Sequence, residues 1–195
     1  MKKILIATSN THKVKEVKDI FDSLNFDVEL ITPKDLDPYN KNEPVEDGDS
    51  FKENSYIKAK FYYDLYHIPT IADDSGICID FYDGKPGIYS ARWLKELSYK
   101  EKNEKITNDL KDSDNRGAQF VCGITYIDDD QTLYFEGILK GNIANKPQGL
   151  EGFGYDPIFI IDGQSKTTAE LGEDFKKYNS HRALALRKLV EYFEK

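Results

Sequence analysis

Two adjacent carboxylates, Asp73 and Asp74, interrupt an otherwise apolar part of the chain. Apolar, strand-like residues lie before them at 71–72 and after them at 77–81. Successive side chains of a strand point to opposite faces, so one carboxylate could bind a cation or accept a proton while the other hydrogen-bonds loop amides. A second interpretation also stays open, in which both aspartates cap a turn ahead of Gly76.

A third carboxylate, Glu46, could complete a site for a hard cation. Magnesium prefers one or two carboxylates together with water and phosphate oxygens, and needs neither histidine nor cysteine. Glu46 lies in the acidic segment 33–49, which lacks hydrophobic periodicity and contains three prolines and Gly48. The segment is therefore predicted to be a long surface loop, a kind of loop that often carries function.

A polar hexapeptide near the N-terminus could hold an anion. It follows the apolar run 4–7 and consists of Thr8, Ser9, Asn10, Thr11, His12 and Lys13. At the start of a helix, free backbone N–H groups and the helix dipole favour an anion, and the lysine adds a full charge. The alternative is that Asn10 or Thr11 caps the helix and that Lys13 is solvated.

Another lysine, Lys58, lies within a second predicted helix. That helix begins at Ser50, because Ser50 and Glu53 have the spacing of a capping box. Helical periodicity puts Lys58 on one face with Asn54 and Ser55. On these local grounds alone, Lys58 is expected to extend into solvent.

The hydrophobic pattern predicts a mixed α/β order of elements, without repeats or a linker, and therefore one compact unit. The predicted helices are 13–24, one from residue 50 to Pro69, a surface helix at 98–111 and a final helix capped by Ser180. The predicted strands are 4–7, 28–31, 71–72, 77–81, 157–161 and a hairpin of 118–128 with 132–140, and a glycine-rich loop spans 147–157.

Composition excludes several classes of protein. With 195 residues and 39% hydrophobic content the chain can bury a core, and no apolar run approaches the length of a membrane span. The net charge of −8 disfavours binding to DNA or RNA. Cys78 and Cys122 lie in apolar runs and are expected to be buried free thiols. A cytoplasmic protein is the resulting expectation.

Two common phosphate-binding motifs are absent from the sequence. There is no G-x-x-x-x-G-K-[ST], and Gly149, Gly152 and Gly154 have the wrong order and context for a dinucleotide fingerprint. Any phosphate site must therefore use another motif.

Five blocks together resemble the inosine triphosphate pyrophosphatase family. They are Thr8-Ser9-Asn10-Thr11-His12-Lys13, Ala72-Asp73-Asp74-Ser75-Gly76, Gly87-Ile88-Tyr89-Ser90-Ala91-Arg92, Phe153-Gly154-Tyr155-Asp156-Pro157 and Ser180-His181-Arg182. Each block is weak alone, but all five occur in order and span nearly the whole chain. The resemblance implies a house-cleaning enzyme that hydrolyses ITP, dITP and XTP to the monophosphate and pyrophosphate with Mg²⁺.

The resemblance also implies an architecture. The expected fold is α/β, with a two-lobed mixed sheet, long central strands, flanking helices and a deep cleft between the lobes. Residues 1–195 would form this single two-lobed domain, and the family usually forms homodimers.

Site roles follow from the resemblance residue by residue. Thr8 to Lys13 and Lys58 would hold the triphosphate, Asp74 would be the catalytic carboxylate, and Asp74 with Glu46 would bind the metal. Ser75 would contact the substrate. The purine pocket would consist of Phe153, Gly154, Tyr155, Asp156, Lys176, His181 and Arg182. Alternatives stay open, because Tyr155 could pack in the sheet and His181 and Arg182 could be first-turn helix residues without a ligand.

Selectivity among purines has a physical basis. Donors that hydrogen-bond a 6-oxo group meet no acceptor in adenine's amino group, and an unpaired buried donor costs about 1–3 kcal/mol. Lys176, His181 and Arg182 would supply such donors, whereas rejection of GTP must depend on pocket shape. Two rivals remain: a nucleotide sensor that does not hydrolyse, and a pyrophosphatase for pyrimidine or methylated nucleotides.

Overall fold

The computed structural model describes residues 2–39 and 42–195. Its helices are α1 (Thr11–Ser23), α2 (Pro33–Leu36), α3 (Phe51–Tyr66), α4 (Tyr99–Asp109), α5 (Thr168–Asn179) and α6 (His181–Phe193). Its strands are β1 (Lys2–Ile6), β2 (Val28–Ile31), β3 (Thr70–Ile79), β4 (Lys85–Pro86), β5 (Gly117–Ile127), β6 (Thr132–Ile143) and β7 (Phe159–Ile161). Single 3-10 turns occupy Asp80–Tyr82, Gly87–Tyr89 and Asp156–Ile158.

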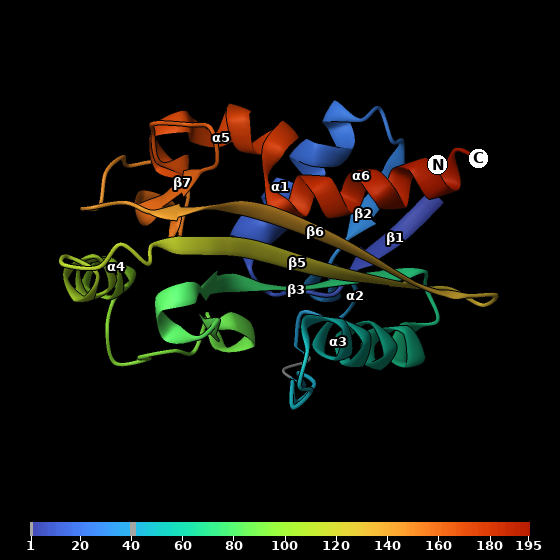
Figure 1. Ribbon diagram of the computed structural model, residues 1–195. Coiled ribbons are helices and arrows are strands. Elements are labelled where there is room, and N and C mark those ends of the chain that lie inside the picture. The colour runs from blue at the N-terminus through green and yellow to red at the C-terminus, as the bar shows by residue number, and fades with distance from the viewer. Residues whose placement is uncertain (1, 40–41) are drawn as a thin grey trace. The chain divides into compact units, whose positions relative to one another are not determined.

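The described strands form a seven-stranded mixed sheet in the order β2-β1-β3-β5-β6-β7, with β4 paired to β3 (Figure 1). β1 is parallel to β2 and β3, whereas β3 with β4 and β6 with β7 are antiparallel. The predicted mixed α/β class is thus confirmed. The chain divides into two compact units: unit 1 holds the described residues of 1–74, 122–137 and 182–195, and unit 2 holds 75–121 and 138–181. A single two-lobed domain stays a prediction.

Unit 1 has a core on each face of its parallel strands. Alternation along β1 sends Ile4 and Ile6 into a cluster with α1 and α6, while Leu5 and the following Ala7 join a cluster with α3. β3 continues this pattern, because Ile71 belongs to the α1 and α6 cluster and Ala72 to the α3 cluster. The next two residues of β3, Asp73 and Asp74, therefore project toward opposite faces.

Unit 2 packs its own core. Ile77 and Ile79 of β3, Ile106 of α4 and Phe120 of β5 are buried together with Phe159 of β7. Helix α4, predicted as a surface helix with few apolar anchors, buries one face, including Lys102, Asn103, Ile106 and Thr107. The sequence did not predict that α4 is partly buried, because three of the four residues on its buried face are polar.

Several predicted boundaries were wrong. Asp73 to Gly76 lie inside the continuous strand β3, so the turn interpretation of this segment is incorrect. The predicted loop 33–49 begins with the short helix α2, and its residues 40–41 lie outside the described residues. Helix α5 was missed, although Thr167 and Glu170 form a capping box. Its helical pattern is interrupted by Gly172, which has a positive φ of 83°.

Both cysteines are free, as expected, with Cys122 buried and Cys78 half-buried. Burial raises the pKa of the Cys122 thiol to about 12, so this thiol stays protonated at neutral pH. Within the described parts of the chain, no helix combines the length and apolar character that crossing a membrane requires.

Candidate active site

The hexapeptide Thr8 to Lys13 links β1 to α1, and its asparagine caps the helix. Asn10 Oδ1 accepts hydrogen bonds from the backbone N–H groups of His12 at 3.0 Å and Lys13 at 3.4 Å. Thr8 Oγ1 accepts the N–H of Asn10 at 3.2 Å. Ser9, Asn10, Thr11 and His12 are exposed. Asn10 therefore caps α1, as one of the two interpretations predicted. The exposed residues of the loop remain accessible to a ligand.

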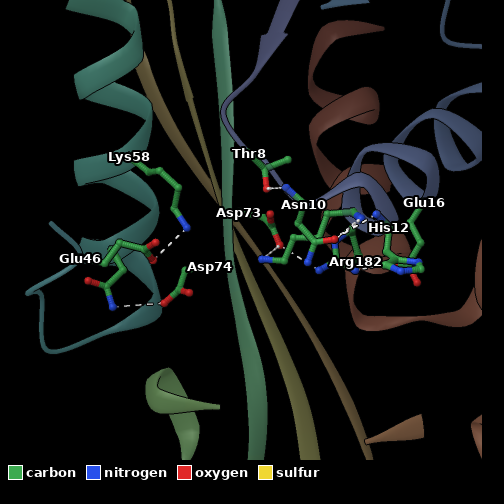
Figure 2. A network of polar contacts seen from close by, with 11 residues as sticks. Thr8, Asn10, His12, Glu16, Glu46, Lys58, Asp73, Asp74 and Arg182 are labelled. Carbon is green, nitrogen blue, oxygen red and sulfur yellow. Dashed lines mark hydrogen bonds and ion pairs between the residues drawn. The ribbon is translucent and has the colours of Figure 1, made fainter. Parts of the chain in front are cut away.

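Lys13 is not a solvated lysine. Its ammonium forms an ion pair of 3.0 Å with Asp73 Oδ2, and only 17% of its side chain is exposed. The same carboxylate oxygen accepts from Arg182 Nη2 at 2.9 Å, and Arg182 Nη1 contacts Glu16 of α1. Figure 2 shows Asp73 on the Arg182 side of β3 and Asp74 on the other side. Asp73 thus joins α1, β3 and α6.

The electrostatics of the two aspartates differ. Burial raises the pKa of Asp73, but the charges of Lys13 and Arg182 outweigh this effect and hold that pKa well below its usual range. Burial raises the pKa of Asp74 to about 6. Lys58 and Lys13 oppose this rise, and the nearby charge of Glu46 adds to it. Asp73 is therefore a permanent anion, whereas Asp74 is a carboxylate that can exchange a proton near neutral pH.

Lys58 and Glu46 form a further ion pair in unit 1. Lys58 Nζ lies 2.9 Å from Glu46 Oε2, and only 12% of the lysine side chain is exposed. The expectation from local sequence that Lys58 extends into solvent was wrong. Lys58 instead faces the acidic segment and Asp74 (Figure 2). Lys13, Glu46, Lys58, Asp73 and Asp74 are called the charged cluster below.

The carboxylates of this cluster fit a magnesium ion. Glu46 lies close enough to Asp74 to raise its pKa, so two like charges share one region that a divalent cation would neutralise. Among the described residues, no group of three histidine, cysteine, aspartate or glutamate side chains could hold a metal. Two carboxylates are nevertheless the usual protein contribution to a magnesium site that is completed by water and phosphate.

In unit 2, Asp156 and Lys176 form a buried ion pair. Lys176 Nζ donates to Asp156 Oδ2 at 2.8 Å and lies 4.9 Å from the centre of the Phe153 ring. Asp156 Oδ2 also accepts the backbone N–H of Phe153 at 2.9 Å, and Oδ1 accepts from Thr168 at 3.1 Å. The carboxylate therefore holds the ammonium of Lys176 and the backbone at Phe153.

A small pocket in unit 2 brings three of the predicted purine-site residues together. Its lining includes Asp156, Lys176 and His181, with Phe120 on the wall. The His181 imidazole stacks on the Phe120 ring, with centroids 4.8 Å apart and planes 12° apart. The pocket thus offers an ammonium and an imidazole beside an aromatic wall.

Gly154, Tyr155 and Arg182, also predicted for the purine site, are not among the residues that line this pocket. Tyr155 is buried in the core of unit 2, where its hydroxyl donates to Ser90 O at 2.8 Å. This is the packing role that the sequence left open for it. Gly154 O accepts from Asn103 Nδ2 at 3.0 Å. Arg182 belongs to unit 1 and is only 1% exposed, within its contacts to Asp73 and Glu16. Ser75 is half-buried and follows Asp74 along β3.

Sequence reasoning missed the residues that support this chemistry. Glu16 lies on α1, and no sequence motif predicts its contact with Arg182. Asn54 does carry a signal, because it precedes Lys58 by four residues and shares its helical face. Thr168 follows the capping residue Thr167, a pattern that predicts the helix from which it reaches Asp156.

Comparison with known proteins identifies the family. The model of the Ham1 family matches residues 4–192. The chain belongs to the Ham1 family. Membership confirms the resemblance seen in the five sequence blocks, and the match covers unit 1 and unit 2 alike.

Similar proteins cover 96–100% of this Ham1 family chain. A dITP/XTP pyrophosphatase of Bacillus subtilis (strain 168) is 42% identical over 199 residues, which cover 100% of this chain and 98% of that protein. A dITP/XTP pyrophosphatase of Aquifex aeolicus (strain VF5) is 38% identical, covering 96% and 95%. The solved structure of the Staphylococcus aureus Ham1 protein has a TM-score of 0.86 at 36% identity, covering 99% and 98%.

Proposed function

We propose that this chain hydrolyses deaminated purine nucleoside triphosphates, such as ITP, dITP and XTP, to the monophosphate and pyrophosphate. The observation that carries the proposal is the charged cluster, in which Lys13 of α1 pairs with Asp73, Lys58 of α3 pairs with Glu46, and both lysines lower the pKa of Asp74. The names of the relatives support the substrate class, because several full-length relatives are dITP/XTP pyrophosphatases.

The charged cluster supplies the groups that phosphoryl chemistry needs. Lys13 and Lys58 neutralise the triphosphate, and the loop Thr8 to His12, which is exposed from Ser9 onward, offers backbone and hydroxyl groups to its oxygens. Asp74 accepts a proton from the water that attacks the α-phosphate, and the bond from this phosphate to the leaving pyrophosphate breaks. Asp73 keeps Lys13 in place. No covalent intermediate is required.

Magnesium is the proposed cofactor, held by Asp74 and Glu46. When bound, it neutralises charge on the phosphate oxygens and on the leaving pyrophosphate. The ion pair of Glu46 with Lys58 supports this assignment, because it holds the glutamate on the side of β3 where Asp74 lies.

The pocket of unit 2 is proposed to recognise the purine. An ammonium group has three donors, so Lys176 can hydrogen-bond a 6-oxo group while it keeps its hydrogen bond to Asp156. His181 adds a ring N–H as a further donor, and Phe153 offers a face for stacking. Adenine has an amino group in place of the 6-oxo group, so the donors of the pocket would meet no acceptor there.

We also propose that the protein acts as a homodimer in the cytoplasm. The usual homodimeric state of the resembled family supports the first part. Two free thiols in place of a disulfide are typical of a reducing compartment and support the second.

A panel of nucleotides tests the proposed activity. The protein is incubated with Mg²⁺ and, in parallel, ITP, XTP, GTP, ATP, dTTP and UTP, and pyrophosphate is distinguished from orthophosphate. We expect rapid pyrophosphate release from ITP and XTP and slow turnover of the other four, because only ITP and XTP carry both a 6-oxo group and no 2-amino group. Equal activity on all six would refute the selectivity, and binding without turnover would indicate a sensor.

A further inference from the structure

Asn54 of α3 connects the acidic segment to the strand that carries Asp74. The residue is fully buried. Its Nδ2 donates to Asp74 Oδ2 at 3.2 Å, and its Oδ1 accepts the backbone N–H of Gly48 at 2.9 Å. One amide side chain thus joins β3 to the backbone two residues after Glu46.

The chemistry of the two neighbours fixes the orientation of this amide. The Gly48 N–H can only donate and the ionised Asp74 carboxylate can only accept, so Oδ1 must face Gly48 and Nδ2 must face Asp74. An asparagine satisfies both partners at once. An aspartate would keep the acceptor for Gly48 but would place a second carboxylate against Asp74.

The acidic segment approaches Asn54 closely because residue 48 is glycine. A Cβ at this position would lie 2.6 Å from Glu53 Cβ and 3.0 Å from Asn54 Oδ1, which is too close for any larger residue without a shift. The absence of a side chain therefore permits the backbone hydrogen bond to Asn54.

Helix α3 holds both carboxylates of the proposed metal site. Asn54 contacts Asp74 directly, and Lys58, one helical turn later, holds Glu46 at 2.9 Å. Because Asn54 and Lys58 lie on one face of a single helix, the positions of Asp74 and Glu46 depend on the same rigid element.

We propose that Asn54 is a positioning residue for the hydrolysis, which fixes the Asp74 carboxylate relative to the segment that carries Glu46. This inference rests on the proposed function. Asn54 acts through Asp74 and Gly48 and contacts no reacting atom itself. Its loss should therefore lower kcat while leaving KM nearly unchanged.

Asn54→Ala and Asn54→Asp test the role, with Ser55→Ala as the matched control. Ser55 is equally buried on the same helix, and its hydroxyl lies 2.7 Å from Thr125 Oγ1, so the control also deletes a buried hydrogen bond. With ITP, both Asn54 variants should lose about 10- to 100-fold in kcat with KM changed less than about threefold. Ser55→Ala should keep its kcat within about twofold.

Thermal melting and Mn²⁺ affinity, measured by calorimetry without nucleotide, complete the experiment. Asn54→Asp is nearly isosteric and keeps the Gly48 contact, so it reports on the role even if Asn54→Ala does not fold. We expect Mn²⁺ affinity to fall about tenfold in Asn54→Ala and to stay unchanged in Ser55→Ala.

The outcomes separate this inference from the proposed function. If both Asn54 variants keep the wild-type kcat, or if Ser55→Ala loses as much kcat as they do, the positioning role of Asn54 is wrong. The proposed function would stand in either case. If the wild type hydrolyses no nucleotide, the proposed function fails, and Mn²⁺ affinity still decides the positioning role. Equal affinity in Asn54→Ala and the wild type overturns it, and a loss in Asn54→Ala without a loss in Ser55→Ala supports it.

Discussion

Asp74→Asn will abolish pyrophosphate release from ITP and leave the protein folded. The substitution removes the oxygen that accepts a proton or binds the metal, and a positioned acid or base contributes about 10²- to 10⁴-fold in rate. Steady-state release of pyrophosphate, measured with Mg²⁺ at pH 7, should fall by at least that range because the metal contact is lost as well.

The raised pKa of Asp74 predicts the direction in which Asp74→Asn changes the stability of the fold. The pKa of Asp74 is raised to about 6 in the folded protein, so burial of its charged form destabilises the fold as pH rises from about 4 through 6. Asparagine carries no such charge. At pH 7 the Tm of Asp74→Asn should therefore equal or exceed that of the wild type.

An exposed carboxylate provides the control for Asp74. Asp64 of α3 pairs with Lys60 on the surface at 2.5 Å, and about half of its side chain is accessible. Asp64→Asn should retain full activity, because surface pairs contribute little. Near-wild-type pyrophosphate release by Asp74→Asn would refute the assignment of Asp74 as the catalytic carboxylate.

Arg182→Met will strongly destabilise the protein. Arg182 is only 1% exposed and faces the carboxylates of Asp73 and Glu16, so the substitution leaves two acids without their shared cation. Removing one partner from a buried ion-pair network typically costs about 3–5 kcal/mol. Urea unfolding at pH 7 should show a loss of that size in the free energy of unfolding.

The pH dependence provides a second signature of this network. Although burial raises the pKa of Asp73, Lys13 and Arg182 hold it below its usual value. The resulting stabilisation is present above about pH 4 and is lost as pH falls further. The stability of Arg182→Met should therefore fall less steeply with acid than that of the wild type.

A surface residue of the same helix provides the comparison for Arg182. Lys188 is exposed and donates to Glu136 O at 2.7 Å. Lys188→Met should change the free energy of unfolding by less than about 1 kcal/mol. A similarly small effect of Arg182→Met would contradict the structural role of the network.

The sequence predicted the local elements of unit 1 well, because their signals are local. A continuous apolar run predicted β1, and the i, i+3, i+4 stripe predicted α1. Ser50 caps α3 as expected, with Glu53 N donating to Ser50 Oγ at 3.1 Å. The second half of that capping box differs, because the Glu53 carboxylate accepts the N–H of Asp49.

Long-range charge pairing could not be predicted from local patterns. Lys58 has neutral neighbours on its own helix, and its partner Glu46 belongs to a segment without periodicity. Asp73 and Asp74 lie inside a strand although aspartate is depleted in strands, because Lys13 and Arg182 compensate the buried charge of Asp73. Before the fold was known, cation chemistry connected Glu46 with the aspartates, and the family resemblance connected Lys13 and Lys58 with Asp74.

Competition between ITP and ATP in one reaction tests the central claim most directly. Equal concentrations are incubated with the protein and Mg²⁺ in ¹⁸O-labelled water, and both monophosphates are followed by mass spectrometry. We predict IMP carrying one ¹⁸O together with unlabelled pyrophosphate, and AMP forming at least about tenfold more slowly, since an unpaired donor costs about 1–3 kcal/mol. Equal rates for ITP and ATP, or ¹⁸O in pyrophosphate or orthophosphate, would contradict the account.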